Sequence, residues 1–337
     1  MRVWFNRHFA LVYRVLRLIR EADTDHRFTL LCTHRHAHFV GYAAADEHAR
    51  EPDPLSTADY VQWCLDFAVA QKVDVFMPAH EANAIVAARE RFEARGIRVL
   101  GVADARTLPR LHNKAWVYRK MAGQVPLAAS TLLRRAADLP SALEHLWSQD
   151  LQACVKPTVS IYGKGFHRLM RAGDPKSPRT RRSLTPDEWV ARYTRAGQRV
   201  SHQVLEYLPG HEFSVDCIGD AGRFVTGVVR KKSITTPTQR LEDHPELLAH
   251  AAKMIARFRL TGLVNIQFKE DQHGVPKLLE INPRASGGVA MSCLSGINLP
   301  YLALCGALDG YAGLQVPAPR LGLRVTEVGS PLVLPHA

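Results

Sequence analysis

Short apolar runs alternate with amphipathic stretches along the first third of the chain. The stretches carry apolar residues at helical spacing and cover residues 11–22, 57–71 and 83–95. The apolar runs have the length of strands and cover residues 3–5, 29–32, 73–77 and 99–102. Strands that alternate with helices in this way predict a parallel, doubly wound sheet. We therefore expect a Rossmann-like domain over residues 1–107.

The first predicted strand is not followed by the glycine-rich fingerprint of a dinucleotide site. Asn6, Arg7 and His8 stand there instead. The fingerprint needs glycines because the backbone must come close to a pyrophosphate. We therefore do not expect a dinucleotide to bind at this turn.

The rest of the chain changes to a pattern of strands joined by turns. A basic helical stretch that begins at Arg110 and contains Lys114 leads into it. Strands are expected at residues 203–207, 212–218, 224–230, 262–269 and 276–281, with one helix at 247–258. Turns such as Pro209-Gly210 favour a largely antiparallel sheet. The fold class is thus α/β with an α+β second part, and the Pro-, Ser- and Arg-rich segment 171–186 is expected to be a surface loop.

Composition and charge narrow the class of protein. The chain has 337 residues, of which 46% are hydrophobic, enough for two or three domains or lobes. The formal charge of +12 implies an anionic partner, and a nucleotide, a phosphorylated substrate and nucleic acid all qualify. The six cysteines form no CxxC pair, which predicts reduced thiols. No apolar run reaches the roughly 18 residues of a membrane span, so we expect a cytoplasmic protein with no membrane partner.

The clearest chemical signal is a predicted strand that ends in polar residues and then glycines, at residues 277–288 (KLLEINPRASGG). Alternate residues of a strand share a face, so Glu280 and Asn282 project together. A hairpin would bring Gln267, on the preceding predicted strand, beside Glu280. Carboxylate and carboxamide oxygens suit a magnesium ion that keeps phosphate and water in its shell. Arg284 can offer a guanidinium to phosphoryl oxygens.

The run from Glu280 to Arg284, followed by glycines, resembles the signature of the ATP-grasp enzymes, particularly the carbamoyl phosphate synthase large-subunit branch. The resemblance covers nearly the whole chain, which has the length for a single synthetase unit. It implies a Rossmann-like pre-ATP-grasp domain at residues 1–107, followed by a two-lobed ATP-grasp domain with antiparallel sheets at 108–337. Within the latter, it implies a small lid subdomain at 124–205 and a C-terminal lobe with the metal site at 206–337.

The resemblance also implies which residues hold the nucleotide. Lys114 and Lys156 match two lysines that contact nucleotide phosphates, and Lys156 and Arg284 are the expected catalytic residues. Glu212 matches a glutamate that binds ribose hydroxyls. The segment Glu206, Tyr207 and Leu208 resembles the one that reads the adenine edge through an acidic side chain and backbone groups.

A loop and a metal site complete the implied ATP site. Residues 160–166 are similar to the family's phosphate-covering loop, although its double-glycine core is replaced here. The loop residues expected to contact the nucleotide are Ser160, Tyr162, Gly163, Lys164 and Gly165. Gln267, Glu280 and Asn282 match the family's metal ligands, for Mg²⁺ or alternatively Mn²⁺.

The implied function is an ATP-dependent carboxylate-amine ligase that works through an acyl phosphate and releases ADP and phosphate. Such a reaction needs positioning and charge neutralisation more than a protein nucleophile, and the residues above supply both. Small-molecule carboxylate and amine substrates are the expected partners, one of them anionic, and a homodimer is left open. The family's substrate pocket points to Asn6, Arg7, His80, Glu81 and residues 286–288.

Two other classes of function stay open. A catalytically weak or silent ATP-binding regulatory protein would fit if Gln267 does not help to hold a metal ion. An RNA-associated protein would use the basic stretch at residues 168–182. That stretch lacks the interleaved aromatic residues on which bases stack, so nucleic acid is not the partner that we expect.

Overall fold

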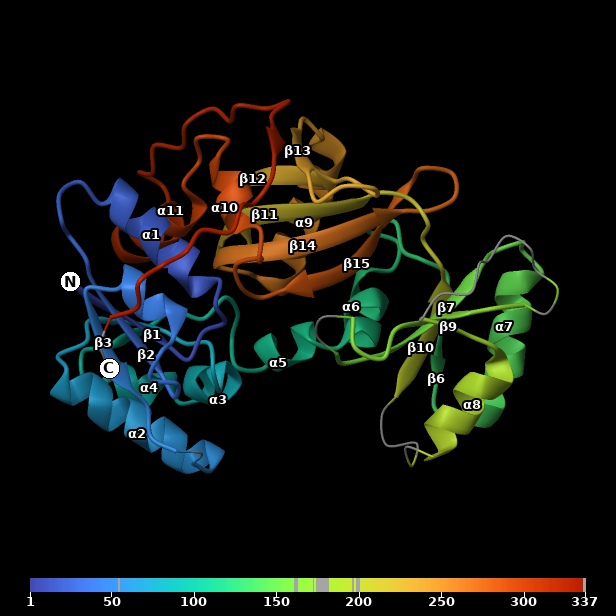
Figure 1. Cartoon of the computed structure of the whole chain (residues 1–337), viewed down its shortest axis with the longest axis horizontal. Helices are drawn as coiled ribbons and strands as arrows, with labels where there is room; N and C mark the ends of the chain where they lie inside the picture. Colours follow the sequence, from blue (N-terminus) through green and yellow to red (C-terminus); the bar gives the residue numbers. More distant parts are fainter. Residues whose placement is uncertain are drawn as a thin grey trace. The chain divides into compact units, whose positions relative to one another are not determined.

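The computed structural model of the chain, drawn in Figure 1, describes residues 1–53, 55–160, 163–171, 173, 182–195, 197 and 201–335. The chain divides into two compact units. The first unit consists of Met1–Pro109, Ser214–Ile266 and Asn282–Ala337, and the second of Arg110–Phe213 and Gln267–Ile281. Of the loop predicted at 171–186, residues 172 and 174–181 lie outside the described residues.

A five-stranded sheet forms the N-terminal part of the first unit. Its strand order is β3-β2-β1-β4-β5, and all four neighbouring pairs are parallel. The strands are β1 (Arg2–Asn6), β2 (Thr29–His34), β3 (Glu47–Arg50), β4 (Val75–Met77) and β5 (Arg98–Val99). The helices between them are α1 (Val12–Ala22), the 3-10 helix η1 (Val40–Ala44), α2 (Thr57–Ala70), α3 (Ala82–Ala87) and α4 (Arg89–Glu93). The predicted parallel, doubly wound sheet is confirmed.

Two details of this sheet differ from the prediction. Strand β3 was not predicted, because it lies at the sheet edge, where none of its residues is buried and no apolar run marks it. The single helix predicted at 83–95 is divided at Ala88, whose backbone angles (φ −91°, ψ 11°) leave the helical region. Sequence periodicity detects buried faces, so it missed the polar edge and the local break.

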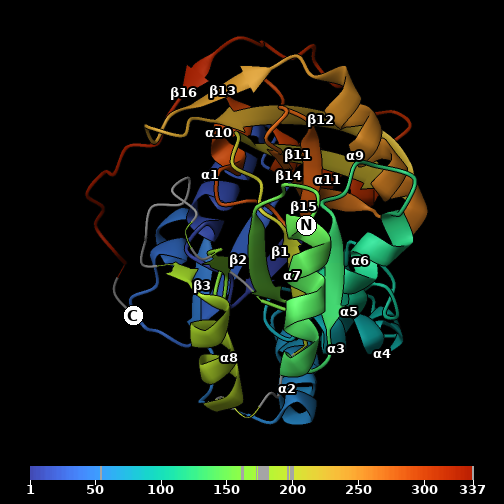
Figure 2. The ribbon, with the colours of Figure 1, turned by 90° about the vertical axis from the view of Figure 1, so that its right-hand side faces the viewer.

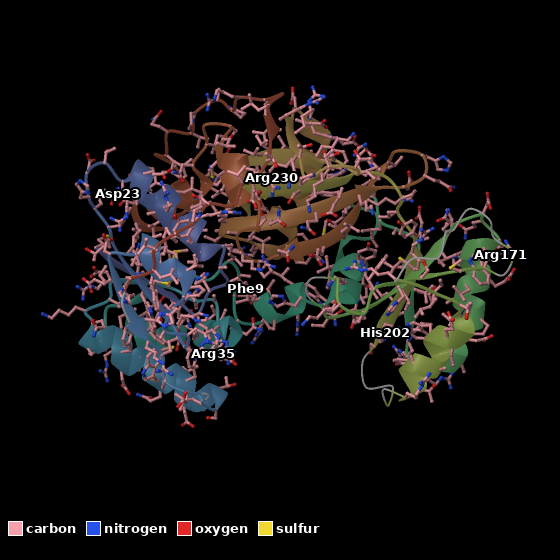
Figure 3. All side chains as sticks on the ribbon, viewed as in Figure 1. Phe9, Asp23, Arg35, Arg171, His202 and Arg230 are labelled. Atoms are coloured by element: carbon pink, nitrogen blue, oxygen red, sulfur yellow. The ribbon has the colours of Figure 1, made fainter. Side chains whose placement is uncertain are left out.

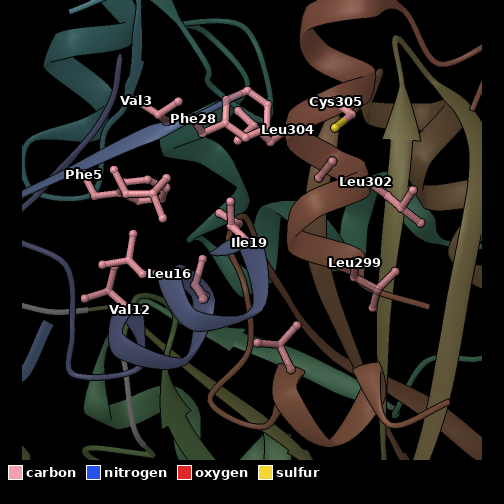
Figure 4. Close-up of a cluster of buried hydrophobic side chains, with 14 of the residues drawn as sticks. Val3, Phe5, Val12, Leu16, Ile19, Phe28, Leu299, Leu302, Leu304 and Cys305 are labelled. Carbon is pink, nitrogen blue, oxygen red and sulfur yellow. The ribbon is translucent and has the colours of Figure 1, made fainter. Parts of the chain in front are cut away.

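Apolar side chains cover both faces of the parallel sheet. Val3 and Phe5 point to one face, where they pack with α1 and with α11 (Leu299–Asp309), as Figure 4 shows. Trp4 points to the other face, where its ring stacks on Phe76 with centroids 4.0 Å apart and meets Phe67 of α2 at 5.0 Å. A strand buried on both faces reads as a continuous apolar run, which is the pattern that the sequence shows at residues 3–5.

A six-stranded sheet has the strand order β15-β14-β11-β12-β13-β16. Its strands are β11 (Glu212–Asp220), β12 (Arg223–Lys232), β13 (Gln239–Glu242), β14 (Gly262–Glu270), β15 (Pro276–Asn282) and β16 (Arg324–Val325). The pairs β12–β13 and β13–β16 are antiparallel. The accompanying helices are α9 (Pro245–Phe258), α10 (Val289–Cys293) and α11. The boundary between the two units falls within β11, β14 and β15.

The second unit contains a five-stranded sheet with the order β6-β10-β7-β8-β9. Its strands are β6 (Ser130–Leu133), β7 (Ala153–Pro157), β8 (His167–Leu169), β9 (Ser183–Leu184) and β10 (His202–Glu206). One face, which includes Leu133, Val155 and Val204, packs on α7 (Leu139–Trp147) and α8 (Pro186–Arg195). Figure 1 shows α6 (Lys114–Met121) on the opposite side of these strands, and in Figure 2 α7 and α8 stand toward the viewer.

Two short elements complete the chain, α5 (Leu108–Leu111) and the 3-10 helix η2 (Ala136–Asp138). Across the described residues, no helix combines the length and the apolar character that a membrane span requires.

Candidate functional site

A cavity of about 290 Å³ opens in the second unit, against the sheet face that α6 covers. The predicted site residues that line it are Lys114, Lys156, Ser160, Gly163, Glu206, Tyr207, Leu208, Glu212, Gln267 and Glu280. The remaining lining residues are Tyr118, Ala128, Cys154, Phe166, Arg182, Leu205, Lys269 and Leu279. The fold therefore gathers, within one unit, side chains that are far apart in the sequence.

Lys114 is the first residue of α6, and local contacts fix its position. The helix begins here because Asn113 caps it, accepting a hydrogen bond from the backbone N–H of Trp116 at 3.0 Å. The Lys114 ammonium donates to the backbone oxygen of Ser160 at 2.9 Å and lies 3.3 Å from the carboxylate of Glu280. The lysine thus joins the start of α6 to the segment after β7 and to β15.

Lys156 lies in β7 and faces the same cavity. Its ammonium lies 5.6 Å from the centroid of the Tyr118 ring, and the Tyr118 hydroxyl donates a hydrogen bond to the backbone oxygen of Leu278. The pKa of Lys156 is lowered to about 8, mainly by burial and also by the positive charge of Lys114. An anionic ligand in the cavity would offset both causes.

The carboxylate of Glu206 is buried and paired within the protein. Lys277 donates to its two oxygens at 2.8 and 2.7 Å, and the backbone N–H of Ala129 donates to one of them at 3.2 Å. Asp271 lies 3.1 Å from the same Lys277 ammonium. The Glu206 side chain is therefore engaged by neighbours, while Tyr207 and Leu208 also line the cavity.

Cationic groups surround the ring of Tyr207. The guanidinium carbon of Arg168 lies 4.2 Å from the ring centroid, and the ammonium of Lys269 lies at 5.6 Å. The ring of Phe166 lies beyond it, with a centroid distance of 6.4 Å. This end of the cavity thus combines aromatic surface with positive charge.

The predicted phosphate-covering loop is described in part. Ser160 and Gly163 line the cavity, whereas Tyr162 lies outside the described residues. Lys164 is exposed and is not part of the cavity lining. Gly165 has φ +76°, and a Cβ on it would come within 2.7 Å of the ring of Pro157, so two constraints favour glycine here.

The three predicted metal ligands fall in different units. Gln267 of β14 and Glu280 of β15 line the cavity of the second unit. Asn282, two residues further along β15, belongs to the first unit, where its amide donates to Asn265 at 3.3 Å. Arg284 also belongs to the first unit and lies with its guanidinium carbon 5.6 Å from the ring centroid of Phe9. Within the described residues, no group of three His, Cys, Asp or Glu side chains could hold a metal ion.

Sequence reasoning did not assign to the nucleotide site three residues that line this cavity, Tyr118, Arg182 and Lys269. It also missed Lys277, which is not a lining residue but pairs with the lining residue Glu206. Tyr118 follows Lys114 by four residues and so shares its helix face. Lys269 follows Gln267 by two residues and so shares its strand face. Those spacings were available signals, whereas Lys277 depends on a long-range pair with Glu206.

A second polar cluster lies in the first unit, beyond the carboxyl ends of β1 and β2. Glu51 accepts from Arg7 at 2.7 Å, from Thr33 at 2.8 Å and from Tyr60 at 2.9 Å. His80 lies next to Arg7, with its Nε2 3.1 Å from the guanidinium. Burial lowers the pKa of His80, and the charge of Arg7 lowers it further.

Asn6 and His8 hold the turns of this region together. The Asn6 side chain accepts from the backbone N–H of Ala79 at 2.7 Å and donates to the backbone oxygen of His80 at 3.1 Å. The pKa of His8 is lowered to about 4, chiefly by burial, with a contribution from the charge of Arg284. Two of the predicted substrate candidates, Asn6 and His80, therefore lie side by side at the end of the sheet.

Ser286 and Gly288, which were also predicted to contact substrate, surround a buried arginine. Arg230, labelled in Figure 3, is 1% exposed and pairs with Asp216 at 2.8 Å. Ser286 accepts from the Arg230 guanidinium at 2.8 Å. A Cβ on Gly288 would come within 2.5 Å of the same guanidinium. Both residues thus serve a packed internal network that sequence reasoning did not predict.

Comparison with known protein families gives one match. The profile of a family described as "ATP-grasp in the biosynthetic pathway with Ter operon" matches residues 199–331. No curated protein matches the sequence.

Solved structures share the fold across most of the chain. The chain is similar to the biotin carboxylase of Campylobacter jejuni in complex with beta-gamma-ATP, with a TM-score of 0.70 and 18% identity over 96% of this chain and 74% of that one. It is similar to the N5-carboxyaminoimidazole synthetase of Staphylococcus aureus complexed with ADP, with a TM-score of 0.60 and 11% identity over 85% and 70% of the two chains. Against the pyruvate carboxylase of Rhizobium etli, the TM-score is 0.68 and the identity 16%, over 96% of this chain but only 30% of that one.

Proposed function

Because the chain has the ATP-grasp fold, we propose that it is an ATP-dependent ligase that joins a carboxylate to an amine and releases ADP and phosphate. The observation that carries the proposal is the cavity of the second unit. Lys114, Lys156, Gln267 and Glu280 all line this cavity. Similar structures were solved with beta-gamma-ATP and with ADP, which supports a nucleotide in this cavity.

In the proposed complex, the cavity takes the nucleotide. Lys114 and Lys156 contact its phosphates, and the lowered pKa of Lys156 reflects a position that suits an anion. Lys277 donates to both carboxylate oxygens of Glu206, so this side chain is not free to bind the nucleotide. The adenine base is therefore bound mainly by backbone groups of residues 206–208 and by the ring of Tyr207. Glu212 binds the ribose hydroxyls from its position on the cavity wall.

The donor groups at the cavity fit a magnesium ion. Glu280 offers carboxylate oxygens and Gln267 an amide oxygen, both hard ligands that line one cavity. Mg²⁺ usually takes only one or two protein carboxylates and completes its shell with phosphate and water, so these two ligands suffice. When bound, the ion would neutralise charge on the phosphates. Lys114 pairs with Glu280 at 3.3 Å and would turn to the phosphates when Glu280 holds the ion.

The proposed reaction has two steps. An oxygen of the substrate carboxylate attacks the γ-phosphorus of ATP, the bond to the bridging oxygen breaks, and ADP leaves with that oxygen. The amine nitrogen then attacks the acyl carbon of the acyl phosphate, inorganic phosphate leaves, and one proton is lost from nitrogen. Lys156 is proposed to stabilise the charge that develops on the transferred phosphoryl group.

An anionic substrate is proposed from the polar cluster of the first unit. Arg7, His34 and His80 gather at the carboxyl ends of parallel strands, where the guanidinium and the imidazole rings offer N–H donors to an anion. Ligands of doubly wound sheets bind at such ends, where the strand order reverses. In the order β3-β2-β1-β4-β5, the reversal lies between β1 and β4, directly at Arg7 and His80.

An activity assay tests the proposal. The purified protein would be incubated with MgATP, a panel of carboxylic acids and ammonium or amino acids, and ADP would be measured. We expect sustained, multiple-turnover ADP release only when a particular acid and amine are both present, and at least about 100-fold less with Glu280→Ala. Glu246→Ala is the control, because its side chain is 69% exposed on α9.

One result would contradict the ligase, and another would contradict the proposed metal site. Tight nucleotide binding without acid-dependent ADP across the panel would favour the catalytically silent regulatory protein. Full activity of Glu280→Ala would remove Glu280 from the metal site.

A further inference from the structure

We propose that Lys277 is a positioning residue of the nucleotide cavity, which fixes the edge that binds the base and so sets a preference for adenine over guanine. The inference rests on the proposed function, in which backbone groups of residues 206–208 bind the base. Among the described residues, Lys277 is not part of the cavity lining, but it pairs with Glu206, which is. Lys277 therefore acts through the fold and not through contact with the nucleotide.

The ammonium group of Lys277 is fully engaged inside the second unit. It has three N–H donors, and three carboxylate oxygens lie close to it. The two oxygens of Glu206 lie at 2.8 and 2.7 Å, and one oxygen of Asp271 lies at 3.1 Å. The side chains of Glu206 and Asp271 are only 3% and 6% exposed. Buried charges of this kind depend on their partner, so Lys277 holds both carboxylates in one geometry.

The two carboxylates belong to different parts of the unit. Glu206 is the last residue of β10, where its backbone N–H donates to the oxygen of Ala129 at 2.8 Å and its Oε2 accepts from the Ala129 N–H at 3.2 Å. Asp271 begins the turn between β14 and β15, and its Oδ1 accepts from two backbone N–H groups of that turn at 2.8 and 2.9 Å. Lys277 thus joins the end of β10 to the β14–β15 hairpin.

The anchored end of β10 is the start of the edge that binds the base. The Tyr207 N–H donates to the oxygen of Gln152 at 2.7 Å, and Lys277 holds the preceding residue, so the direction of the following backbone groups is fixed. Adenine presents an amino donor beside a ring acceptor, whereas guanine presents an oxygen acceptor beside a ring N–H donor. Backbone groups held in fixed places match only one of these two edges, which gives the site its base preference.

The strand that carries the metal ligand has anchors of its own. The Leu278 N–H donates to the oxygen of Pro126 at 2.9 Å, and the Leu278 oxygen accepts from the hydroxyl of Tyr118. These bonds hold β15 two residues before Glu280 without the help of Lys277. Removing the Lys277 ammonium should therefore disturb the base edge and leave the subsite of the phosphates and the ion in place.

Isothermal titration calorimetry with MgADP, MgGDP and magnesium tripolyphosphate tests the role, because the third ligand has phosphates but no base. Lys277→Met should weaken MgADP at least about tenfold and reduce the preference for ADP over GDP at least about fivefold. The affinity for magnesium tripolyphosphate should stay within about twofold, since separate subsites contribute nearly independently. Glu280→Gln should instead weaken MgADP and magnesium tripolyphosphate alike.

Three further variants separate positioning from a loss of stability. Combining Lys277→Met with Glu206→Gln removes one of the two carboxylates that lose their cation, and it should still weaken MgADP at least about tenfold. Lys277→Arg keeps a cation between the two carboxylates and should recover most of the preference for ADP. Arg135→Met is the control, because it breaks an ion pair of the same unit in which the arginine side chain is 77% exposed. It should leave all three affinities unchanged.

The outcomes distinguish this role from the proposed function. Equal weakening of all three ligands by Lys277→Met, unchanged MgADP affinity in the combined variant, or equal affinity of the unaltered protein for ADP and GDP would overturn the positioning role and leave the nucleotide site standing. If the unaltered protein bound neither MgADP nor magnesium tripolyphosphate, the proposed nucleotide cavity would fail, and the role of Lys277 with it.

Discussion

Two cationic centres, one in each unit, differ in how completely the protein pairs them: Arg230 is buried and Lys156 is half-buried. Arg230 in the first unit donates to Asp216, Ser214, Ser286 and Ser292, and it also contacts Gln239. Lys156 in the second unit lies over the ring of Tyr118, and in the described part of the chain no carboxylate lies within ion-pair distance of it. The charge of Arg230 is satisfied internally, whereas the charge of Lys156 is open to the cavity.

The difference separates an architectural charge from a binding charge. A fully paired buried ion holds its neighbours in place but offers nothing to a ligand. An under-paired cation with a lowered pKa costs the folded protein energy unless an anion joins it. We infer that Arg230 stabilises the packing of the first unit and that Lys156 binds the phosphates of a nucleotide.

The largest expected effect is on stability, from Arg230→Met. The change leaves the Asp216 carboxylate, which is 0% exposed, without its cation, and we expect the free energy of unfolding to fall by about 3–5 kcal/mol. Urea unfolding followed by circular dichroism measures it. Arg223→Met is the control, because its ion pair with Asp220 is exposed and contributes at most about 1 kcal/mol. Equal losses for the two variants would contradict an architectural role for Arg230.

The next effect is on function, from Lys156→Met. Removing the cation should lower ADP release at least about 100-fold, because charge on the transferred phosphoryl group loses a stabilising partner. Stability should be kept or increased, since a desolvated charge is removed. ADP release and the midpoint of thermal unfolding are measured on the same preparation. If Lys156→Met were destabilised but kept normal turnover, Lys156 would have a structural role and not a role in binding the nucleotide.

The sequence predicted the parallel sheet and several residues of the cavity, but it did not predict which charged side chains are paired inside the protein. Periodicity sufficed for β1, α1 and the parallel sheet, because burial on a face leaves a repeat in the sequence. The resemblance to ATP-grasp enzymes suggested Lys114 and Lys156, and strand alternation suggested Glu280; the fold places these three residues at one cavity. The sequence did not indicate the role of Arg230, because a basic residue inside a strand usually lies in solvent and the partners of Arg230 are distant in sequence. The pairing of Glu206 with Lys277 was hidden for the same reason.

Gln203 of β10 shows a second limit of sequence reasoning, because its side chain is 3% exposed and its Oε1 has no hydrogen-bond partner in the described part of the chain. Alternation along β10 indicates only that Gln203 and Leu205 share a face. Whether that face is packed, wet or hollow depends on α6, which reaches it from another part of the chain. Cavities are properties of packing between elements, and no local pattern encodes them.

The smallest expected effect is the pH dependence of nucleotide binding. The pKa of Lys156 is about 8 in the free protein, and bound phosphates would raise it, so the free form loses its proton first as pH rises. Between pH 7 and 9, the affinity for MgADP should fall about tenfold. Isothermal titration calorimetry at several pH values measures the fall, and proton uptake on binding near pH 8.5 should accompany it. Lys156→Arg should bind with little pH dependence, because a guanidinium stays charged throughout this range. If that variant showed the same slope, the titrating group would be another residue, and Lys156 would be no more open to ligand than Arg230.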